Sequence, residues 1–304
     1  MPLPASRWGL VPAQLIDGKK IADDVRSKLK PRLARLSDSG VVPGLAAVLV
    51  GDNPASRLYV KMKAKASEEM GMAHWTIELR ADVSESRLLQ EVERLNVDPK
   101  VHGILVQQPL PPQIGVEKAI ASVRPSKDVD CFHPENVGLV LIGRPRFAPA
   151  TPAGVVELLL RSGHDPDGKD VVILGRSNIV GKPLAALLVQ KARGANATVT
   201  VAHSATRDLA AHTRRADILV AAIGSPQFVK ADMVRDGAVV IDVGINRIAD
   251  PTSKSGSRTV GDVDFDGVRM KASAISPVPG GVGPMTIAML LSNTVRAAEM
   301  AAHA

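Results

Sequence analysis

The fold prediction starts from one stretch, Val171-Val-Ile-Leu-Gly175-Arg176-Ser177-Asn178-Ile179-Val180-Gly181-Lys182-Pro183. An apolar strand runs into a glycine turn, and the turn opens directly into a helix. In such a joint the backbone N–H groups and the helix N-terminus converge on one place, where they can bind the phosphates of a dinucleotide. The spacing departs from the usual G-x-G-x-x-G, because Ser177 replaces the second glycine and Gly181 comes one residue late. Two interpretations follow, a nucleotide site or an ordinary strand–turn–helix joint.

The residues after the next predicted strand favour NADP over NAD. An NAD site usually carries an acidic residue about 20 residues after the turn, which binds the ribose 2′-hydroxyl. Here the strand is followed by His203-Ser204-Ala-Thr-Arg207, and no carboxylate comes before Asp208. Arg176 follows the first glycine, where its guanidinium could pair with a 2′-phosphate. The alternative is that Arg176 only faces solvent.

Short β-rich runs alternate with helical patterns along the chain. This alternation predicts βαβ units, a mainly parallel sheet and the α/β fold class. The pattern starts again near Thr151-Pro-Ala-Gly154, which predicts a domain boundary at residues 150–155. Periodicity leaves open whether the last helix closes the second domain or returns to the first. The predicted strands are 45–50, 75–79, 103–106, 171–174, 197–202, 217–222 and 238–243, and the predicted helices are 56–70, 84–96, 155–161, 181–190, 208–213 and 285–301.

Length and composition exclude several classes of protein. The 304 residues correspond to about two domains. A single cysteine excludes an internal disulfide and favours a reducing, cytoplasmic compartment. The apolar runs are far shorter than the ~18 residues of a membrane span, and residues 1–13 are expected to be a loose tail without signal-peptide character. The net charge of +7 predicts acidic partners, whereas an aromatic content of 2% disfavours single-stranded nucleic acid.

The helix predicted for residues 56–70 places Tyr59 and Lys63 one turn apart on one face. A Tyr–Lys pair at this spacing is more often surface packing, but it can also join a stacking ring to an amine that moves protons. We expect Lys61, Lys63 and Lys65 to lower one another's pKa values, and partial burial to lower the pKa of Lys63 further. A general base needs such a neutral amine.

Further candidates lie in loops. Gln107 follows the strand 103–106, and Asp130 ends the segment Lys127-Asp-Val-Asp130; ligands bind at such strand ends, although loop capping explains both residues as well. The loop 276–285 contains three Pro and three Gly, which predicts a close backbone approach to a ligand. No spacing of His or Cys indicates a metal site, and Cys131 has no partner cysteine.

Taken together, these segments closely resemble bifunctional methylenetetrahydrofolate dehydrogenase/methenyltetrahydrofolate cyclohydrolase. The most specific ones are Pro277-Val-Pro-Gly-Gly-Val-Gly-Pro-Met-Thr286 and the turn Gly175-Arg-Ser-x-x-Val-Gly181. The matching segments follow the family order over nearly the whole chain: 15–22, 59–66, 106–110, 127–130, 133–136, 151–154, 175–181, 261–265 and 277–286.

The resemblance implies an activity and an architecture. The activity is NADP-dependent oxidation of 5,10-methylenetetrahydrofolate to 5,10-methenyltetrahydrofolate, followed by hydrolysis to 10-formyltetrahydrofolate. The architecture is a cleft between a folate-binding domain, residues 14–152 plus 286–304, and a Rossmann-like NADP-binding domain, residues 153–285. We further expect a cytoplasmic homodimer that takes tetrahydrofolate derivatives and binds neither nucleic acid nor membranes.

The resemblance also implies roles for single residues. Lys63 would be the catalytic lysine, supported by Gln107, with Tyr59 stacking on the pterin and Asp130 bonding its pyrimidine edge. A carboxylate can accept two parallel N–H bonds from such an edge. Further substrate contacts are implied for Pro279, Gly280 and Gly281, and cofactor contacts for Gly175, Arg176, Ser177, Gly181, His203, Ser204 and Ile245.

The two implied steps need different groups. Hydride leaves a carbon flanked by two nitrogens, and a nitrogen lone pair stabilises the resulting cation, so alignment matters more than acid or base. Addition of water to the methenyl carbon does need a proton acceptor. We therefore expect Lys63 to matter more for hydrolysis. This hypothesis requires the Lys63 amine and the turn at residues 175–181 to face the same groove.

One position departs from the family, because Cys131 stands where glycine usually follows the aspartate. If the backbone there needs a positive φ, the cysteine strains the loop and displaces Asp130. Its thiol is either sensitive to oxidation or, as we favour, an inert small group.

Two other functions are alternatives. One is another two-domain NADP dehydrogenase of shikimate type, which also relies on a Lys–Asp pair; activity with folate and NADP distinguishes the two. The other is a basic nucleic-acid-binding protein, which the pI near 9.6 would support. Salt-sensitive DNA binding without dehydrogenase activity would favour that function.

Overall fold

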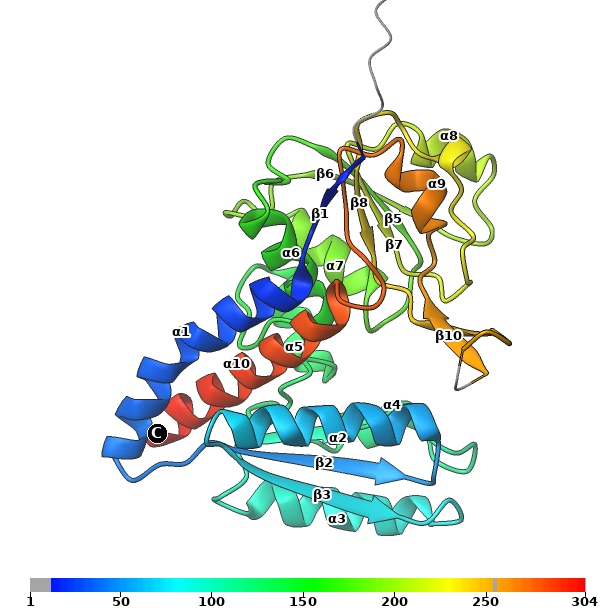
Figure 1. Ribbon diagram of the computed structural model, residues 1–304. Helices are drawn as coiled ribbons and strands as arrows, with labels where there is room; N and C mark the ends of the chain where they lie inside the picture. Colours follow the sequence, from blue (N-terminus) through cyan, green and yellow to red (C-terminus); the bar gives the residue numbers. More distant parts are fainter. Residues whose placement is uncertain (1–11, 254–255, 304) are drawn as a thin grey trace, which may run out of the picture.

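The computed structural model describes residues 12–253 and 256–303. These residues form two parts, each built on a parallel sheet, and two long helices connect the parts (Figure 1). The predicted α/β class is confirmed. Residues 1–11 of the predicted tail lie outside the described residues, whereas Ala13 is buried and its N–H donates to the carbonyl of Arg269. In the described part of the chain, no helix is both long and apolar enough to span a membrane.

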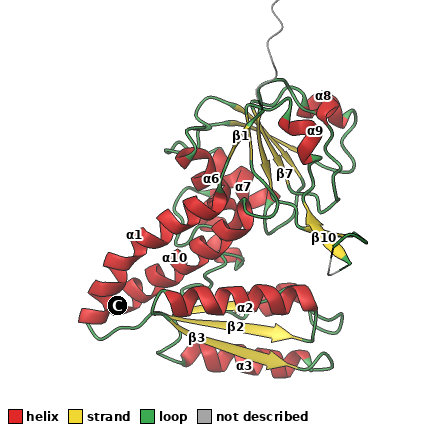
Figure 2. Ribbon diagram, viewed as in Figure 1, coloured by secondary structure: helices red, strands yellow, loops and turns green. Residues whose placement is uncertain are grey.

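The first part holds a three-stranded parallel sheet in the order β3-β2-β4. Its central strand is an apolar run that is buried along its whole length, because helices cover both faces (Figure 2). Leu45 packs on one face with Val60 of α2, and Val48 packs on the other with Leu88 of α3. The elements are β2 (Gly44–Val50), α2 (Pro54–Glu69), β3 (Ala73–Leu79), α3 (Glu85–Val97), β4 (Gly103–Val106), α4 (Val116–Ala121) and α5 (Pro134–Leu141).

The second part holds a six-stranded parallel sheet in the order β1-β11-β8-β7-β5-β6. Ile173 of β5 faces helices α6 and α7, while its neighbour Leu174 faces the side of α9, so the sheet is doubly wound. An antiparallel hairpin, β9–β10, follows the end of β8. The elements are β1 (Gln14–Leu15), α6 (Ala150–Arg161), β5 (Asp170–Leu174), α7 (Gly181–Leu188), β6 (Thr198–Ala202), α8 (Leu209–Thr213), β7 (Ile218–Ala221), a short 3-10 helix (Ala231–Met233), β8 (Val239–Asp242), β9 (Asn246–Ala249), β10 (Ser257–Val260), α9 (Phe265–Arg269) and β11 (Ala274–Ile275).

Helices α1 (Gly18–Asp38) and α10 (Val282–Ala302) lie side by side and link the two parts (Figure 1). Met285 of α10 packs into the core of the second sheet, Leu290 into that of the first, and Leu291 against α1. The last helix therefore serves both parts, which answers the question that periodicity left open. The predicted division placed residues 14 and 15 in the first domain, but Gln14 pairs with Ala274 at the edge of the second sheet. The rest of the division stays a prediction.

Candidate active site

Helix α2 carries the candidate lysine toward the space between the two sheets. Its first turn is capped by Asn53, whose Oδ1 accepts backbone N–H groups, and Tyr59 and Lys63 follow on one face. Lys63 is buried, and its Nζ donates to Oε1 of Gln107 at 3.2 Å. The Nε2 of Gln107 donates to the carbonyl of Gln108 at 2.8 Å. This second bond fixes the amide so that its oxygen faces the amine.

The charges of Lys63 and Asp130 are coupled. Burial lowers the pKa of the Lys63 amine, and the negative charge of Asp130 opposes that shift. Burial raises the pKa of the Asp130 carboxyl; Lys63 counteracts this shift, whereas Asp128 adds to it. The expectation that burial lowers the pKa of Lys63 is confirmed, whereas Lys61 and Lys65, which are both exposed, are not among the causes of the shift.

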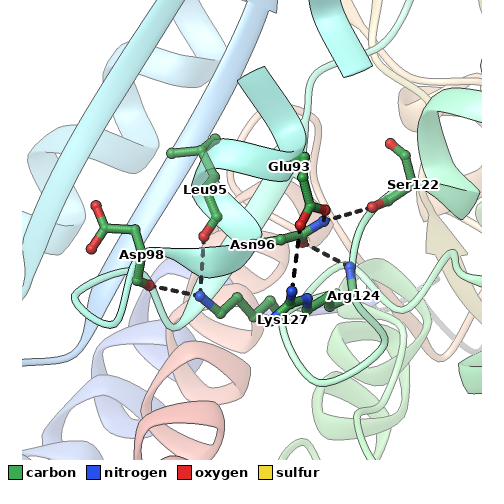
Figure 3. Close-up of polar contacts among 7 residues, drawn as sticks. All are labelled: Glu93, Leu95, Asn96, Asp98, Ser122, Arg124 and Lys127. Carbon is green, nitrogen blue, oxygen red and sulfur yellow. Dashed lines mark hydrogen bonds and ion pairs between the residues drawn. The ribbon is translucent and has the colours of Figure 1, made fainter. Parts of the chain in front are cut away.

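The segment leading to Asp130 is anchored to the end of α3 (Figure 3). Asn96 donates its Nδ2 to the carbonyl of Ser122 at 2.8 Å and accepts the backbone N–H of Arg124 at 2.9 Å. Lys127 donates its Nζ to the carbonyls of Leu95 and Asp98 at 3.0 and 2.7 Å. These bonds satisfy backbone groups that no sheet or helix would satisfy. They hold the chain just before the carboxylate.

Buried polar side chains hold the same loop at and after Asp130. The carboxylate of Asp128 accepts the backbone N–H groups of Phe132 and His133, at 3.1 and 2.8 Å. Asn293 of α10 donates its Nδ2 to the carbonyls of Val129 and Ala148, both at 2.8 Å. The position of Asp130 is therefore set by the end of α3, by the side chain of Asp128 and by α10.

Cys131 has a φ of 62°, so the position does need the left-handed backbone for which glycine is suited. The side chain is buried, and its Sγ lies 3.2 Å from the carbonyl of Phe147, to which it can donate. Burial raises the pKa of the thiol. A non-glycine residue in this conformation costs about 1–3 kcal/mol. Several hydrogen bonds hold the loop of the neighbouring Asp130 in place despite this strain.

We expect the Cys131 thiol to be unreactive in the folded protein. It is the only cysteine in the chain, and the reactive thiolate is suppressed by burial and the raised pKa. Ellman's reagent at neutral pH should give almost no colour with native protein and one equivalent after denaturation in guanidinium chloride. Rapid titration of the native protein would show that the loop around Asp130 opens.

A cavity of about 290 Å³ lies between the two sheets. Four sequence candidates of the first part line it, namely Tyr59, Lys63, Gln107 and Asp130. Ile179 and Val180 of the glycine turn line its other wall, together with Ile245 and the first turns of α10. The Lys63 amine and the turn at residues 175–181 therefore face one groove, as the hypothesis requires.

The glycines of the turn at residues 175–181 pack closely against backbone carbonyl groups. A Cβ on Gly175 would lie 2.0 Å from the carbonyl oxygen of Ala222, and one on Gly181 would lie 2.1 Å from the oxygen of Gly175. The Ser177 Oγ accepts the N–H of Val180 at 3.1 Å, so the serine that replaces the second glycine caps the turn. No side chain fits at Gly175 or Gly181, so the start of α7 packs closely on the end of β5, and a helix N-terminus in this place can bind a phosphate group.

Arg176 and His203 place two donors side by side. The Nδ1 of His203 accepts the N–H of Ala205 at 3.2 Å, so in the neutral ring the proton is assigned to Nε2. That Nε2 lies 3.5 Å from Nη1 of Arg176, and two N–H donors cannot bond each other. Both are free to donate to one anion, and Ser204 is exposed beside them. The residues present fit a 2′-phosphate.

The proline–glycine loop packs against the start of α1. A Cβ on Gly18 would lie 1.9 Å from the carbonyl oxygen of Gly281, and the oxygen of Gly280 accepts the N–H of Lys19 at 3.1 Å. Pro279, Gly280 and Gly281 line a second, mainly apolar cavity of about 450 Å³. Tyr59 and Ile245 line both cavities, so the second continues from the first.

Two buried carboxylates were missed as candidates, Asp242 and Asp262. Asp262 lies in the segment 261–265, and nothing in the spacing of this segment indicates what an aspartate there contacts. For residues 12–253 and 256–303, no group of three or more His, Cys, Asp or Glu side chains is placed to hold a metal ion.

Comparison with known proteins gives two family matches that together cover most of the chain. Residues 16–130 match the catalytic domain of tetrahydrofolate dehydrogenase/cyclohydrolase, and residues 149–302 match its NAD(P)-binding domain. The bifunctional protein FolD of Salinibacter ruber is 57% identical over 290 residues, which cover 95% of this chain and 97% of the relative. That of Chlorobium luteolum is 56% identical over 290 residues, with 94% and 98% covered.

Solved structures of FolD enzymes are also similar to this chain. The FolD enzyme of Campylobacter jejuni has a TM-score of 0.89 at 48% identity, covering 95% of this chain and 99% of that one. The FolD of Trypanosoma brucei, complexed with NADP cofactor and inhibitor, has a TM-score of 0.91 at 42% identity, covering 97% and 100%. A shikimate 5-dehydrogenase of Thermus thermophilus reaches 0.50 at 16% identity, covering 84% and 99%, which shows likeness of fold alone. The chain belongs to the tetrahydrofolate dehydrogenase/cyclohydrolase family.

Proposed function

We propose that this chain oxidises 5,10-methylenetetrahydrofolate with NADP and hydrolyses the 5,10-methenyltetrahydrofolate so formed to 10-formyltetrahydrofolate, within one-carbon metabolism. The observation that carries the proposal is the shared cavity, in which Lys63, Gln107 and Asp130 face the turn at residues 175–181. One group of residues suits the pterin, and the other suits the phosphates of a dinucleotide. Family membership supports the same assignment.

In the oxidation, the chain's task is to hold and align. Asp130 accepts N–H bonds from the pyrimidine edge of the folate, and Tyr59 offers the stacking face of its ring. Arg176 and His203 hold the 2′-phosphate of NADP, and the turn closed by Ser177 holds its diphosphate. NADP, when bound, accepts the hydride that leaves the methylene carbon. No side chain has to move a proton in this step, because the substrate's own nitrogen stabilises the cation.

In the hydrolysis, Lys63 acts as proton acceptor. A bond forms between the water oxygen and the methenyl carbon, and the bond from that carbon to N5 breaks. The water oxygen loses both its protons: one ends on N5, and the other is released in net. Because burial lowers the pKa of Lys63, more of its amine is neutral near neutral pH than in an exposed lysine. Gln107 accepts an N–H from Nζ and so holds the amine at the wall of the cavity.

The second cavity suits the tail of the substrate, which carries carboxylates. Its lining is mainly apolar, and Arg247 is the cationic side chain among the lining residues. Within residues 12–253 and 256–303, no carboxylate forms an ion pair with Arg247, and the side chain is exposed. We propose that its guanidinium meets a tail carboxylate at the rim.

Replacing Arg247 by Gln is expected to raise the KM for methylenetetrahydrofolate about threefold, the effect of losing one exposed ion pair. The kcat and the KM for NADP should not change, since Arg247 is remote from the reacting carbon in this assignment. Initial rates at low ionic strength measure all three constants. Arg258→Gln is the matched control, because Arg258 lies on the same hairpin, pairs with Asp250 and does not line the cavity. An equal rise in both variants would contradict the assignment.

The proposed activity is tested with the purified chain. NADPH should form from methylenetetrahydrofolate and NADP, and methenyltetrahydrofolate should be consumed without NADP. Absence of both reactions, or reduction of NADP with shikimate instead of folate, would overturn the proposal.

We propose, too, that the protein is a cytoplasmic homodimer that does not bind nucleic acid. The family resemblance supports the dimer. The single cysteine supports a reducing compartment, and the low aromatic content argues against base stacking.

A further inference from the structure

Asp262 is fully buried after β10 and acts as an acceptor for two other loops. Its Oδ2 accepts the backbone N–H groups of Ile223 and Gly224, at 2.7 and 2.9 Å. Its Oδ1 accepts Nδ2 of Asn246 at 2.8 Å. One carboxylate thus joins the loop after β7 to the first residue of β9.

Asp242, the last residue of β8, also joins separate loops through its carboxylate. Its Oδ1 accepts the N–H groups of Gly244 and Asp262, both at 2.9 Å, and its Oδ2 accepts the N–H of Val263 at 2.9 Å. The backbone N–H of Asp242 is itself bonded to Oγ of Ser276 at 2.8 Å. The two carboxylates together accept six hydrogen bonds and tie three loops into one unit, which we call the carboxylate clamp (Asp242 and Asp262).

The loops that the clamp holds lie on the side of the glycine turn, and Asp242, Gly244 and Ile245 also line the second cavity. Ala222, which precedes the clamped Ile223, presses its carbonyl against Gly175, where a Cβ would be only 2.0 Å away. Ile245 stands between the clamped residues Gly244 and Asn246 and lines both cavities. A shift of either loop would therefore move the phosphate-binding turn or the wall that Ile245 forms.

The clamp needs its charge. Backbone N–H donors favour an ionised acceptor, and hydrogen bonds to charged groups are about twice as strong as neutral ones. Burial raises the pKa of Asp242 to about 6, with its N–H donors opposing the shift and the charge of Asp262 adding to it. Both carboxylates being buried, an isosteric amide tests the charge without a change of volume.

We propose that Asp242 and Asp262 are positioning residues for NADP: their carboxylates accept hydrogen bonds from the protein's own N–H groups, and they hold the glycine turn and Ile245 where the cofactor binds. This inference rests on the proposed function. It predicts that loosening the clamp weakens NADP and leaves the rate of hydrolysis at saturating methenyltetrahydrofolate unchanged, because Lys63, Gln107 and Asp130 are held by other elements.

The test is Asp262→Asn, in which an amide N–H₂ replaces one acceptor oxygen and meets donors. The Kd for NADP, measured by calorimetry without substrate, should rise about tenfold, as expected for the loss of one hydrogen bond to a charged group. The KM for NADP should rise in parallel. The rate of hydrolysis at saturating methenyltetrahydrofolate, which needs no NADP, should stay within twofold. Asp250→Asn is the control, since it is an aspartate of the same hairpin outside the clamp.

A second variant covers a failure of Asp262→Asn to fold. Asn246→Ala removes one donor and keeps both carboxylates, and it should weaken NADP by two- to fivefold without changing hydrolysis. NADP affinity within twofold of the unmodified protein in Asn246→Ala and in any folded Asp262→Asn would overturn the inference. So would an equal loss in NADP affinity and in the saturating rate of hydrolysis, which indicates general destabilisation. If the unmodified protein lacks both activities, the proposed function fails instead.

Discussion

Replacing Lys63 by Met is expected to lower the rate of methenyltetrahydrofolate hydrolysis by about 10²–10⁴-fold, the usual contribution of a positioned acid or base. Methionine keeps the length and apolar stem of the lysine in a buried site and removes only the amine. The oxidation should lose less than about tenfold, because it depends on alignment rather than proton transfer. Separate initial-rate assays with methylenetetrahydrofolate plus NADP and with methenyltetrahydrofolate alone measure the two effects.

Lys61→Met is the matched control for this variant. Lys61 lies on the same helix, two residues away, and is exposed, so neither rate should change. The loss of Lys63 also removes the charge that opposes the raised pKa of Asp130, so folate binding must be measured directly. If both activities fall equally while folate still binds, the proposed division of labour between the two steps is wrong.

Replacing Arg176 by Ala should weaken NADP by about 10–100-fold, because one or two hydrogen bonds between charged groups are lost. The affinity for NAD, which has no 2′-phosphate, should be unchanged. His203 would remain as a single donor, so NADP is weakened rather than excluded. Calorimetric titration with both dinucleotides measures the selectivity.

Arg207→Ala is the control for the loss of a positive charge, since Arg207 is exposed and lies in the loop of His203, after β6. Equal losses for NADP and NAD in Arg176→Ala would show that the guanidinium does not contact the 2′-phosphate. They would place it on the diphosphate that both dinucleotides share.

Many of the strands and helices could be predicted because each is an apolar run or a run of one periodicity. The strand predicted for 103–106 matches β4, and the turn at Gly175–Gly181 joins β5 to α7 as predicted. The two-residue strands β1 and β11 have no periodicity to detect, and they form only because they pair across the sequence. Helix α6 begins at Ala150, five residues before the predicted start, because Pro152 is tolerated in the first turn.

The site residues that could be predicted are those whose side chains have a chemical function of their own. Tyr59, Lys63, Gln107 and Asp130 come together in one cavity, although their roles stay a proposal. The sequence indicated burial of Lys63, but it could not show that burial, and not the neighbouring lysines, accounts for the lowered pKa, because the extent of burial is a property of the fold. Nor could it indicate the carboxylate clamp, since its partners are backbone N–H groups, which every residue type except proline offers.

Helix α10 limits how this enzyme can be divided into separate domains. Its side chains complete the core of both sheets, and Asn293 holds the loop of Asp130 from a helix that begins beside the cofactor wall. Neither half is therefore an exchangeable module. A chimera that swaps the dinucleotide part for that of a relative would have to keep α10 matched to the recipient's folate part, or it would open the first core while it changed the cofactor.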